Sequence, residues 1–223
     1  MIEYTFYMQL RDLLDRIPGY NAWRFRQLGG SSQYWERRYS TGENSGDGSY
    51  GASAQHKAKV LNAFVRDHDI QSVVEFGCGD GNQLALAEYP AYTGLDIAPS
   101  SIQICSKRFA GDRSKTFVLY RPQQWNGDVA ADLSMSLDVL YHLVEDDVYH
   151  TYLRHLFGAS RKYVSIYSSN ENQLPSTPHV KLRRFSDDVA QLIPEFRLTH
   201  VVESPAAGFC PFYFYERAHG DSI

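Results

Sequence analysis

The chain has 223 residues and a formal net charge of -4 at pH 7. Hydrophobic residues make up 43% of it, which is enough for a sizeable core and too many for a disordered chain. The acidic balance disfavours nucleic acid as a partner, because nucleic-acid binding usually requires a basic face. The length predicts one domain, residues 53–223, with an N-terminal addition, residues 1–52.

The three cysteines, Cys78, Cys105 and Cys210, are odd in number and far apart. They have neither metal-ligand spacing nor a disulfide framework, so a reducing, cytoplasmic setting is the simplest expectation. The histidines and acids show no metal spacing either, and we expect chemistry without a metal. The first residues mix acids and bases, unlike a signal peptide, and nothing approaches the roughly 20 apolar residues of a membrane span.

The N-terminal addition has two parts. Residues 4–17 carry apolar side chains at helical spacing and predict an amphipathic helix, for which plain packing is the alternative to a lid. Residues 29–51, "GGSSQYWERRYSTGENSGDGSYG", predict a loop because they are rich in Gly, Ser and Asn. Long loops in compact domains are usually functional or disordered, and the four aromatic residues argue against disorder. We therefore predict a lid loop that orders over a ligand.

From residue 53 onward, predicted helices and strands alternate along the chain. The predicted strands are residues 73–76, 92–96, 116–120, 131–136, 163–168, 197–204 and 209–217. The predicted helices are residues 53–69, 82–89, 99–109 (capped by Ser100 or Ser101), 145–157 and 185–193. This alternation predicts an α/β protein with a parallel sheet covered on both faces. The two closing strands have only a short linker, so one of them should be antiparallel.

Three glycines within five residues follow the first of these strands, in "VVEFGCGDGNQL", residues 73–84. Glycine in an ordered position costs entropy and serves where a side chain would obstruct a turn, a packing contact or a ligand. A dinucleotide fingerprint requires G-x-G-x-x-G, but Asn82 stands where its third glycine would be. A diphosphate is therefore less well matched here. Asp96 ends the next strand, where a carboxylate can accept hydrogen bonds from ribose hydroxyls or cap a helix.

The form E-x-G-x-G-x-G, Glu75 to Gly81, resembles motif I of class I S-adenosylmethionine (SAM)-dependent methyltransferases. The stretch "ADLSMSLDVLYHLVED", residues 131–146, resembles the region around their motif IV. The loop before the core is similar to one in a bacterial group linked to glycan or small-molecule modification. The resemblance covers roughly residues 54–167. It implies SAM as cofactor, S-adenosylhomocysteine (SAH) as product, and a Rossmann-like three-layer sandwich whose mostly parallel seven-stranded sheet has an antiparallel closing strand.

The resemblance also implies a cofactor site at the strand ends. There Glu75 would hold the ammonium of the cofactor, Asp96 its ribose, and Arg38 its carboxylate. The predicted cofactor-binding residues are Tyr34, Arg38, Glu75, Gly77, Cys78, Gly79, Gly81, Asn82, Asp96, Ile97, Ser136 and Leu137.

Methyl transfer from a sulfonium requires mainly positioning and exclusion of water. A hydroxyl acceptor benefits in addition from a general base. His142 is the first candidate, because neutral imidazole is available near pH 7. Asp138 is the second. The alternatives are a structural hydrogen bond for His142 and orientation of the cofactor or a water for Asp138.

The acceptor is expected to be a hydroxyl of a small molecule or glycan building block. The predicted substrate-binding residues are Trp35, Tyr50, Tyr141, Tyr167, His179 and Arg183. Arg183 suits a carboxylate or phosphate, although a solvated basic turn is the alternative. Rival functions are a methyltransferase of protein or RNA, an NAD-dependent oxidoreductase, and a non-catalytic SAM-binding module. The aromatic residues 209–217 could form a core strand or part of a homodimer interface.

Overall fold

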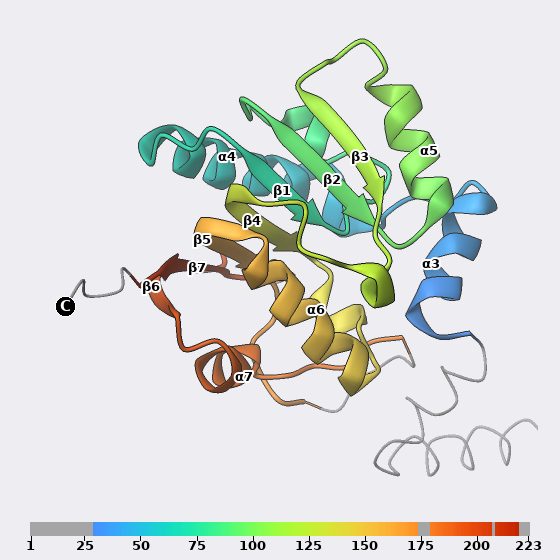
Figure 1. Ribbon diagram of the computed structural model, residues 1–223. Helices are drawn as coiled ribbons and strands as arrows, with labels where there is room; N and C mark the ends of the chain where they lie inside the picture. The colour runs from blue at the N-terminus through green and yellow to red at the C-terminus, as the bar shows by residue number, and fades with distance from the viewer. Residues whose placement is uncertain (1–28, 174–178, 207, 219–223) are drawn as a thin grey trace, which may run out of the picture.

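A seven-stranded sheet forms the centre of the computed structural model, which describes residues 29–173, 179–206 and 208–218 (Figure 1). The strand order is β3-β2-β1-β4-β5-β7-β6. The strands are β1 Val73–Phe76, β2 Tyr92–Asp96, β3 Lys115–Leu119, β4 Ala131–Leu137, β5 Ser160–Tyr167, β6 Phe196–Val202 and β7 Phe212–Arg217. Strands β1 to β5 pair in parallel, and β7 runs antiparallel to both β5 and β6. The predicted Rossmann-like fold, with its antiparallel closing strand, is confirmed.

Helices cover both faces of the sheet (Figure 1). The helices are α3 Gly30–Ser40, α4 Gly51–Asp67, α5 Pro99–Arg108, α6 Asp146–Gly158 and α7 Phe185–Leu192. Four short 3-10 turns are η1 Asp47–Ser49, η2 Leu84–Leu86, η3 Pro122–Gln124 and η4 Leu140–His142. One apolar cluster joins α6 and α7 to the sheet, and a second joins α4 and α5 to its other face. Because side chains alternate along a strand, Val74 and Phe76 of β1 lie in the first cluster and Val73 in the second.

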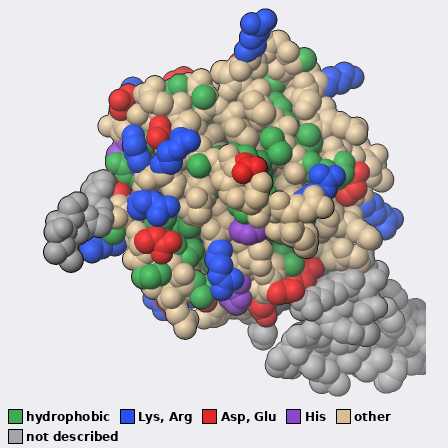
Figure 2. Space-filling view, viewed as in Figure 1, with side chains coloured by type: hydrophobic (Ala, Val, Ile, Leu, Met, Phe, Trp, Pro, Cys, Tyr) green, Lys and Arg blue, Asp and Glu red, His purple; other side chains and the backbone are tan. Residues whose placement is uncertain are grey.

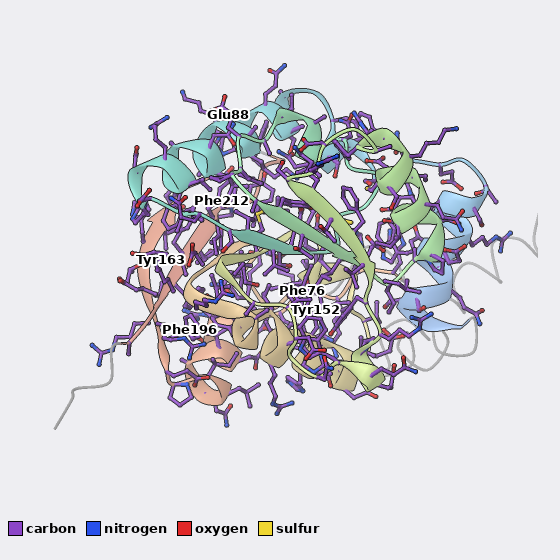
Figure 3. The ribbon with its side chains drawn as sticks, turned by 45° about the horizontal axis from the view of Figure 1, so that its top comes forward. Phe76, Glu88, Tyr152, Tyr163, Phe196 and Phe212 are labelled. Carbon is purple, nitrogen blue, oxygen red and sulfur yellow. The ribbon has the colours of Figure 1, made fainter. Side chains whose placement is uncertain are left out.

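Aromatic side chains make up much of these layers (Figure 3). Phe76 of β1 and Tyr152 of α6 pack edge to face, with ring centroids 5.7 Å apart. The Tyr152 hydroxyl also lies 2.9 Å from the carbonyl oxygen of Phe76 and 2.7 Å from Oγ of Ser136. A buried tyrosine needs such partners for its hydroxyl, and these two anchor α6 to the carboxyl ends of β1 and β4.

Residues 30–40 form a helix, so the predicted loop over 29–51 is wrong in this part. The segment is polar, and only Gly30, Ser31 and Tyr39 are buried, so periodicity gave no signal. Contacts with other elements hold the helix instead. The Ser31 hydroxyl donates to Oε2 of Glu145 at 2.8 Å, and the Ser100 hydroxyl donates to Oε1 of Glu36 at 2.6 Å.

The helix predicted over residues 82–89 is also wrong, because this segment contains only the three-residue turn η2. The side chain of Asn62 in α4 forms hydrogen bonds with backbone groups of this segment. Its side-chain amide donates to the carbonyl of Leu86 at 3.0 Å, and its Oδ1 accepts from the backbone N–H of Glu88 at 3.0 Å. Pro90 follows and disfavours helical backbone at the residue before it.

From residue 53 onward, the other predicted elements are present, with two refinements. Helix α5 has Ala98 as its N-cap and Pro99 in its first turn, so neither Ser100 nor Ser101 is the cap. Instead, the Glu36 carboxylate of α3 accepts from the backbone N–H of Ser100 at 3.0 Å. The aromatic end of the chain is a core strand, since β7 lies between β5 and β6 and buries Phe212, Phe214 and Tyr215. The helix predicted over residues 4–17 lies outside the described residues.

Gly81→Ala is expected to lower the free energy of unfolding by roughly 2 to 5 kcal/mol. Gly81 has φ +72°, and a Cβ there would lie 2.8 Å from Cε2 of Phe109 and 3.0 Å from Sγ of Cys105. Gly111→Ala is the matched control, because Gly111 has no positive φ and nothing lies within 4 Å of its added Cβ. Urea denaturation measures both variants. Equal unfolding free energies would contradict the close packing of this loop.

Candidate functional site

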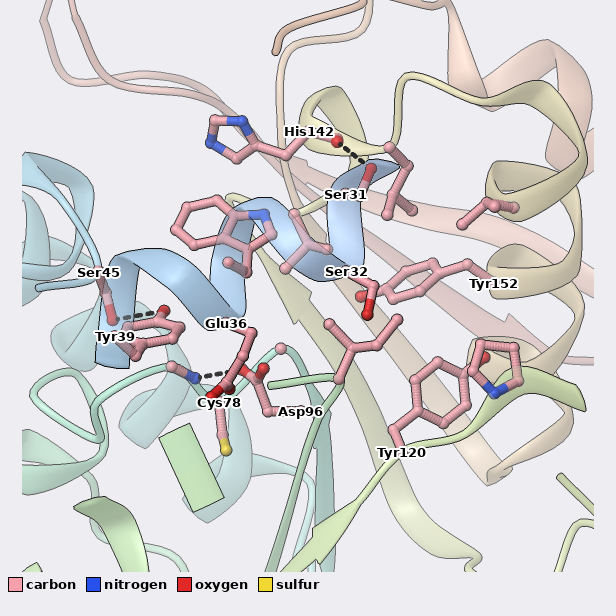
Figure 4. A pocket seen from close by; sticks show the side chains of 18 of the residues that line it. Ser31, Ser32, Glu36, Tyr39, Ser45, Cys78, Asp96, Tyr120, His142 and Tyr152 are labelled. Atoms are coloured by element: carbon pink, nitrogen blue, oxygen red, sulfur yellow. Dashed lines mark hydrogen bonds between the residues drawn. The ribbon is translucent and has the colours of Figure 1, made fainter. Parts of the chain in front are cut away.

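A cavity of about 810 Å³ lies at the carboxyl edge of the sheet, lined by the ends of β1, β2, β3 and β4. Between β1 and β4 the strand order reverses, which is where open α/β sheets bind their ligands. Helix α3 crosses the cavity, and Figure 4 shows Ser32, Glu36 and Tyr39 of this helix beside it. On the face seen in Figure 2, basic and acidic side chains are interspersed. Among the described residues, no helix is long and apolar enough to cross a membrane, and no group of three His, Cys, Asp or Glu could hold a metal.

Asp96 ties the glycine loop to the start of α5. Its Oδ2 accepts from the backbone N–H of Gly79, and its Oδ1 accepts from that of Ala98, both at 2.9 Å. Its side chain is buried, which raises the pKa of the carboxyl group, while these two hydrogen bonds act in the opposite direction. Asp96 and its neighbour Ile97 both line the cavity. A carboxylate therefore stands at the end of β2, directly beside the glycine loop.

Glu75 places a second carboxyl group on the cavity wall. It is 3% exposed, and its Oε2 accepts from the Tyr92 hydroxyl at 2.5 Å. Burial raises its pKa to about 7, against the lowering effects of the Tyr92 hydrogen bond and the Lys57 charge. At neutral pH the group is close to half ionised, so a cation in the cavity would draw it toward the carboxylate form.

Glu75→Gln is expected to change how stability depends on pH. Since the pKa is about 7 in the folded chain against 4.5 for the free group, the proton favours folding. The stability it contributes is full below pH 4.5 and is lost as the pH rises through 7. The wild type should therefore lose roughly 3 kcal/mol relative to Glu75→Gln between pH 4.5 and 8. Urea denaturation at both pH values measures this, and a pH-independent difference would contradict it.

Lys57 of α4 enters the site although the sequence analysis did not select it. It is 1% exposed, and its Nζ lies 2.6 Å from Oδ2 of Asp138. The sequence did contain a signal, because Lys57 falls in the apolar stripe of α4 formed by Ala54, Ala58 and Leu61. A charged residue at such a core position requires a partner, and here the partner lies on the cavity wall.

Asp138 follows the end of β4 in a strained conformation, with φ 60°. Its Oδ1 accepts from the Tyr141 hydroxyl at 2.8 Å, while Oδ2 meets Lys57. Non-glycine residues in the left-handed region concentrate at functional sites, where the surrounding structure holds them. The position favours a functional role for Asp138, with both oxygens already engaged.

His142 lines the cavity beside Trp35, whose ring stands edge-on at 5.1 Å between centroids. Its Nδ1 lies 3.2 Å from the carbonyl oxygen of His179, and a carbonyl can only accept, so this nitrogen carries the proton. Its Nε2 is then the basic nitrogen. Burial lowers the pKa of the imidazole to about 4, so the ring is neutral at physiological pH.

Residues 45–50, which precede α4, pack against the glycine loop, residues 77–81. The backbone N–H of Ser45 and the hydroxyl of Tyr50 both donate to Oδ2 of Asp80, at 2.9 and 2.8 Å. The backbone N–H of Asp80 donates in return to Oγ of Ser45 at 2.9 Å. A Cβ on Gly79 would lie 2.3 Å from that same oxygen. Residues 45–50 and the glycine loop are therefore closely packed. We propose that this segment forms part of a lid over the cavity.

The structure brings half of the predicted site residues to the cavity. Those that line it are Trp35, Glu75, Gly77, Cys78, Gly79, Asp96, Ile97, Leu137, Asp138 and His142. Those that do not are Tyr34, Arg38, Tyr50, Gly81, Asn82, Ser136, Tyr141, Tyr167, His179 and Arg183. Lining residues that the sequence analysis missed include Ser31, Glu36, Tyr39, Lys57, Asp80, Gln83, Tyr120 and Tyr152.

The two predicted arginines, Arg38 and Arg183, are not among the residues that line the cavity. Arg38 donates to the carbonyl of Asn44 at 2.6 Å and does not line the cavity, but its guanidinium lies 5.8 Å from the ring centroid of Trp35, which does. Arg183 donates to the carbonyls of Leu143 and Val144 at 2.7 and 3.0 Å and pairs with Asp146 at 2.8 Å. Its donors are used within the chain, so it holds η4 against α6 and is not placed to receive an acidic acceptor.

No family model and no curated protein matches the chain. Solved structures do. The N-methyltransferase NodS from Bradyrhizobium japonicum WM9, in complex with SAH, is similar with a TM-score of 0.67 and 15% identity over 85% of this chain and 99% of that one. The magnesium protoporphyrin IX methyltransferase ChlM from Synechocystis PCC 6803, with bound SAM, is similar with a TM-score of 0.62 and 16% identity, over 84% and 97% of the two chains.

An amino pentose methyltransferase from Micromonospora echinaspora, involved in calicheamicin biosynthesis and bound to SAM, is similar with a TM-score of 0.60 and 13% identity. The match covers 76% of this chain and 94% of the amino pentose methyltransferase. These similarities define the fold, which is the Rossmann-like fold of class I SAM-dependent methyltransferases, as the sequence resemblance implied.

Proposed function

We propose that the protein is a SAM-dependent methyltransferase whose acceptor is a hydroxyl of a small molecule or glycan building block. The observation that carries this proposal is the charge of the glycine loop and its surroundings. Glu75, Asp80 and Asp96 all line the cavity around the loop. Acidic side chains suit a ligand that carries an ammonium and a sulfonium, and they repel a diphosphate.

The segment after the loop supports the same choice against NAD. Dinucleotides place their diphosphate on the N-terminus of the helix that follows the glycine loop. In this chain the loop leads instead into η2, Leu84–Leu86, which is too short to provide such a dipole. Three of the similar structures hold SAM or SAH, which agrees with this assignment.

Within the cavity, Asp96 would hold the ribose, Glu75 the ammonium, and the backbone of Gly77 and Gly79 the chain between them. SAM would supply a methyl group on a sulfonium that leaves as a neutral thioether. The residues of this chain then need to align the acceptor, exclude water and remove one proton. Helix α3 covers the cavity, which supports a small acceptor over a folded macromolecule.

His142 is our candidate for the general base, because its Nε2 carries a lone pair and its ring lines the cavity. A base is needed for a hydroxyl acceptor, whereas a neutral amine can attack without one. Asp138, engaged by Lys57 and Tyr141, is better suited to orient the reactants. Trp35 is the remaining predicted acceptor contact that lines the cavity, and we propose it as a stacking surface for the acceptor.

The acceptor class can be tested with methyl-labelled SAM and an extract of the source organism, separated into small-molecule, glycan-lipid, protein and RNA fractions. Label in the small-molecule or glycan fraction, absent with Asp96→Ala, would support the proposal. Label in protein or RNA would overturn the acceptor class. SAM binding without label in any fraction would favour the non-catalytic binding module.

A further inference from the structure

We propose that Lys57 is a positioning residue for the candidate base His142. It acts through Asp138 and Tyr141, whose contacts connect the two side chains. The inference rests on the proposed function, because it concerns the step in which His142 removes a proton from the acceptor. It gives a role in the reaction to Lys57, a residue that the sequence analysis did not select.

Contacts from three other elements hold Asp138 in its strained conformation. Its backbone N–H donates to the carbonyl of Tyr167, at the end of β5, at 2.9 Å. Its Oδ2 accepts from Nζ of Lys57 on α4 at 2.6 Å. A Cβ on Gly48 would lie 2.7 Å from that same oxygen, so the backbone of η1 packs directly against the carboxylate. A φ of 60° costs energy in a non-glycine residue and persists only where the surrounding structure enforces it.

Lys57 supplies the positive charge in this arrangement. Asp138 is its salt-bridge partner among the described residues, and the two side chains are 1% and 16% exposed. Separating such a pair would leave each member as an unpaired charge shielded from water, which is strongly unfavourable. The place of the Asp138 carboxylate therefore depends on Lys57.

Asp138 in turn holds η4, the turn that carries His142. Its Oδ1 accepts from the Tyr141 hydroxyl at 2.8 Å, and the ring centroids of Tyr141 and His142 lie 4.5 Å apart. Burial lowers the pKa of the imidazole to about 4, and the charge of Asp138 acts in the opposite direction, so the carboxylate is felt at the ring. The carbonyl of His179 orients the ring through Nδ1, whereas the contacts that begin at Lys57 fix the turn on which the ring stands.

Methyl transfer from labelled SAM to an extract of the source organism tests this role, with the Kd for SAH measured by isothermal titration of the same full-length variants. Lys57→Met and Tyr141→Phe should each lower the transfer rate by roughly 10- to 100-fold, because a small displacement of a base is costly. The Kd for SAH should stay within about threefold. In a His142→Asn background neither substitution should lower the rate by more than about a further twofold, because the base that they position is gone. A merely structural role would give losses that add.

Two further variants keep the test decisive. Lys57→Met with Asp138→Asn replaces the charged pair by a neutral one, so the test remains possible if Lys57→Met alone does not fold. Tyr149→Phe is the matched control for Tyr141→Phe and should leave the rate unchanged. Tyr149 also donates its hydroxyl to a carboxylate, Oδ2 of Asp188 at 2.7 Å, but it does not line the cavity.

Three results would each overturn this role of Lys57. They are an unchanged rate in Lys57→Met and Tyr141→Phe, losses that add to that of His142→Asn, and a loss of SAH affinity as large as the loss of rate. A wild type that does not bind SAH, or that binds it and labels no fraction of the extract, would instead overturn the proposed function itself.

Discussion

Asp96→Ala is expected to weaken SAH binding by roughly 10²- to 10⁴-fold. The carboxylate would accept from two ribose hydroxyls, and each hydrogen bond to a charged group contributes about 1.5 to 3 kcal/mol. The variant also frees the backbone N–H groups of Gly79 and Ala98, which Asp96 now holds at 2.9 Å. Isothermal titration of the folded variant measures the change.

Asp132→Ala is the matched control for this prediction. Asp132 is also a buried strand carboxylate that accepts from a backbone N–H, that of Gln71 at 3.0 Å. It lies near the start of β4, at the opposite edge of the sheet from the cavity. Asp132→Ala should reduce stability and leave the Kd for SAH unchanged. A similar loss of SAH binding in both variants would show that Asp96 acts through the fold alone.

His142→Asn is expected to reduce kcat for a hydroxyl acceptor by roughly 10²-fold. Asparagine keeps an N–H donor for the carbonyl of His179 but has no basic nitrogen at the position of Nε2. The Kd for SAH should change little. His179→Asn is the control, because the side chain of His179 stacks on His142 but does not line the cavity.

The pH dependence distinguishes His142 from other bases. Because the imidazole acts as a base only when neutral and its pKa is about 4, kcat should be flat between pH 6 and 8. Cofactor binding should instead strengthen as the pH rises through 7, where Glu75 loses its proton. If Asp138→Asn abolishes turnover and His142→Asn does not, Asp138 is the base and the assignment of His142 is wrong.

Much of the fold could be predicted because its signals are local. The strands are short apolar runs that end at turn residues, and Val73–Phe76 and Tyr92–Asp96 were predicted to the residue. Helix α3 could not be predicted, because its stability comes from Glu145 and Ser100, distant in sequence, and not from its own pattern. The prediction of a helix after the glycine loop was wrong for the same reason. Asn62 of α4, distant in sequence, hydrogen-bonds to the backbone of Leu86 and Glu88.

The candidate site also combines residues that the sequence predicts with residues that it does not. Glu75 and Asp96 could be predicted to lie close together, because residues at the carboxyl ends of adjacent parallel strands meet. Lys57 meets Asp138, and Gln83 meets Ala54, only when α4 packs against the sheet, and no sequence spacing encodes either contact. Arg38 and Arg183 were predicted as binding residues because of their charge. The guanidinium of Arg183 instead donates to the carbonyls of Leu143 and Val144 and pairs with Asp146. Charge in a sequence does not show whether a partner within the chain already holds it.

We propose that the cavity beside β1 and β4 binds SAM and not a dinucleotide. Equilibrium dialysis of the full chain against labelled SAM, with unlabelled SAH or NAD as competitor, is the decisive experiment. We expect stoichiometric binding of SAM that SAH displaces and that NAD in large excess does not. Absence of bound SAM, or its displacement by NAD at a concentration comparable to that of SAH, would show that the cavity is not a SAM site.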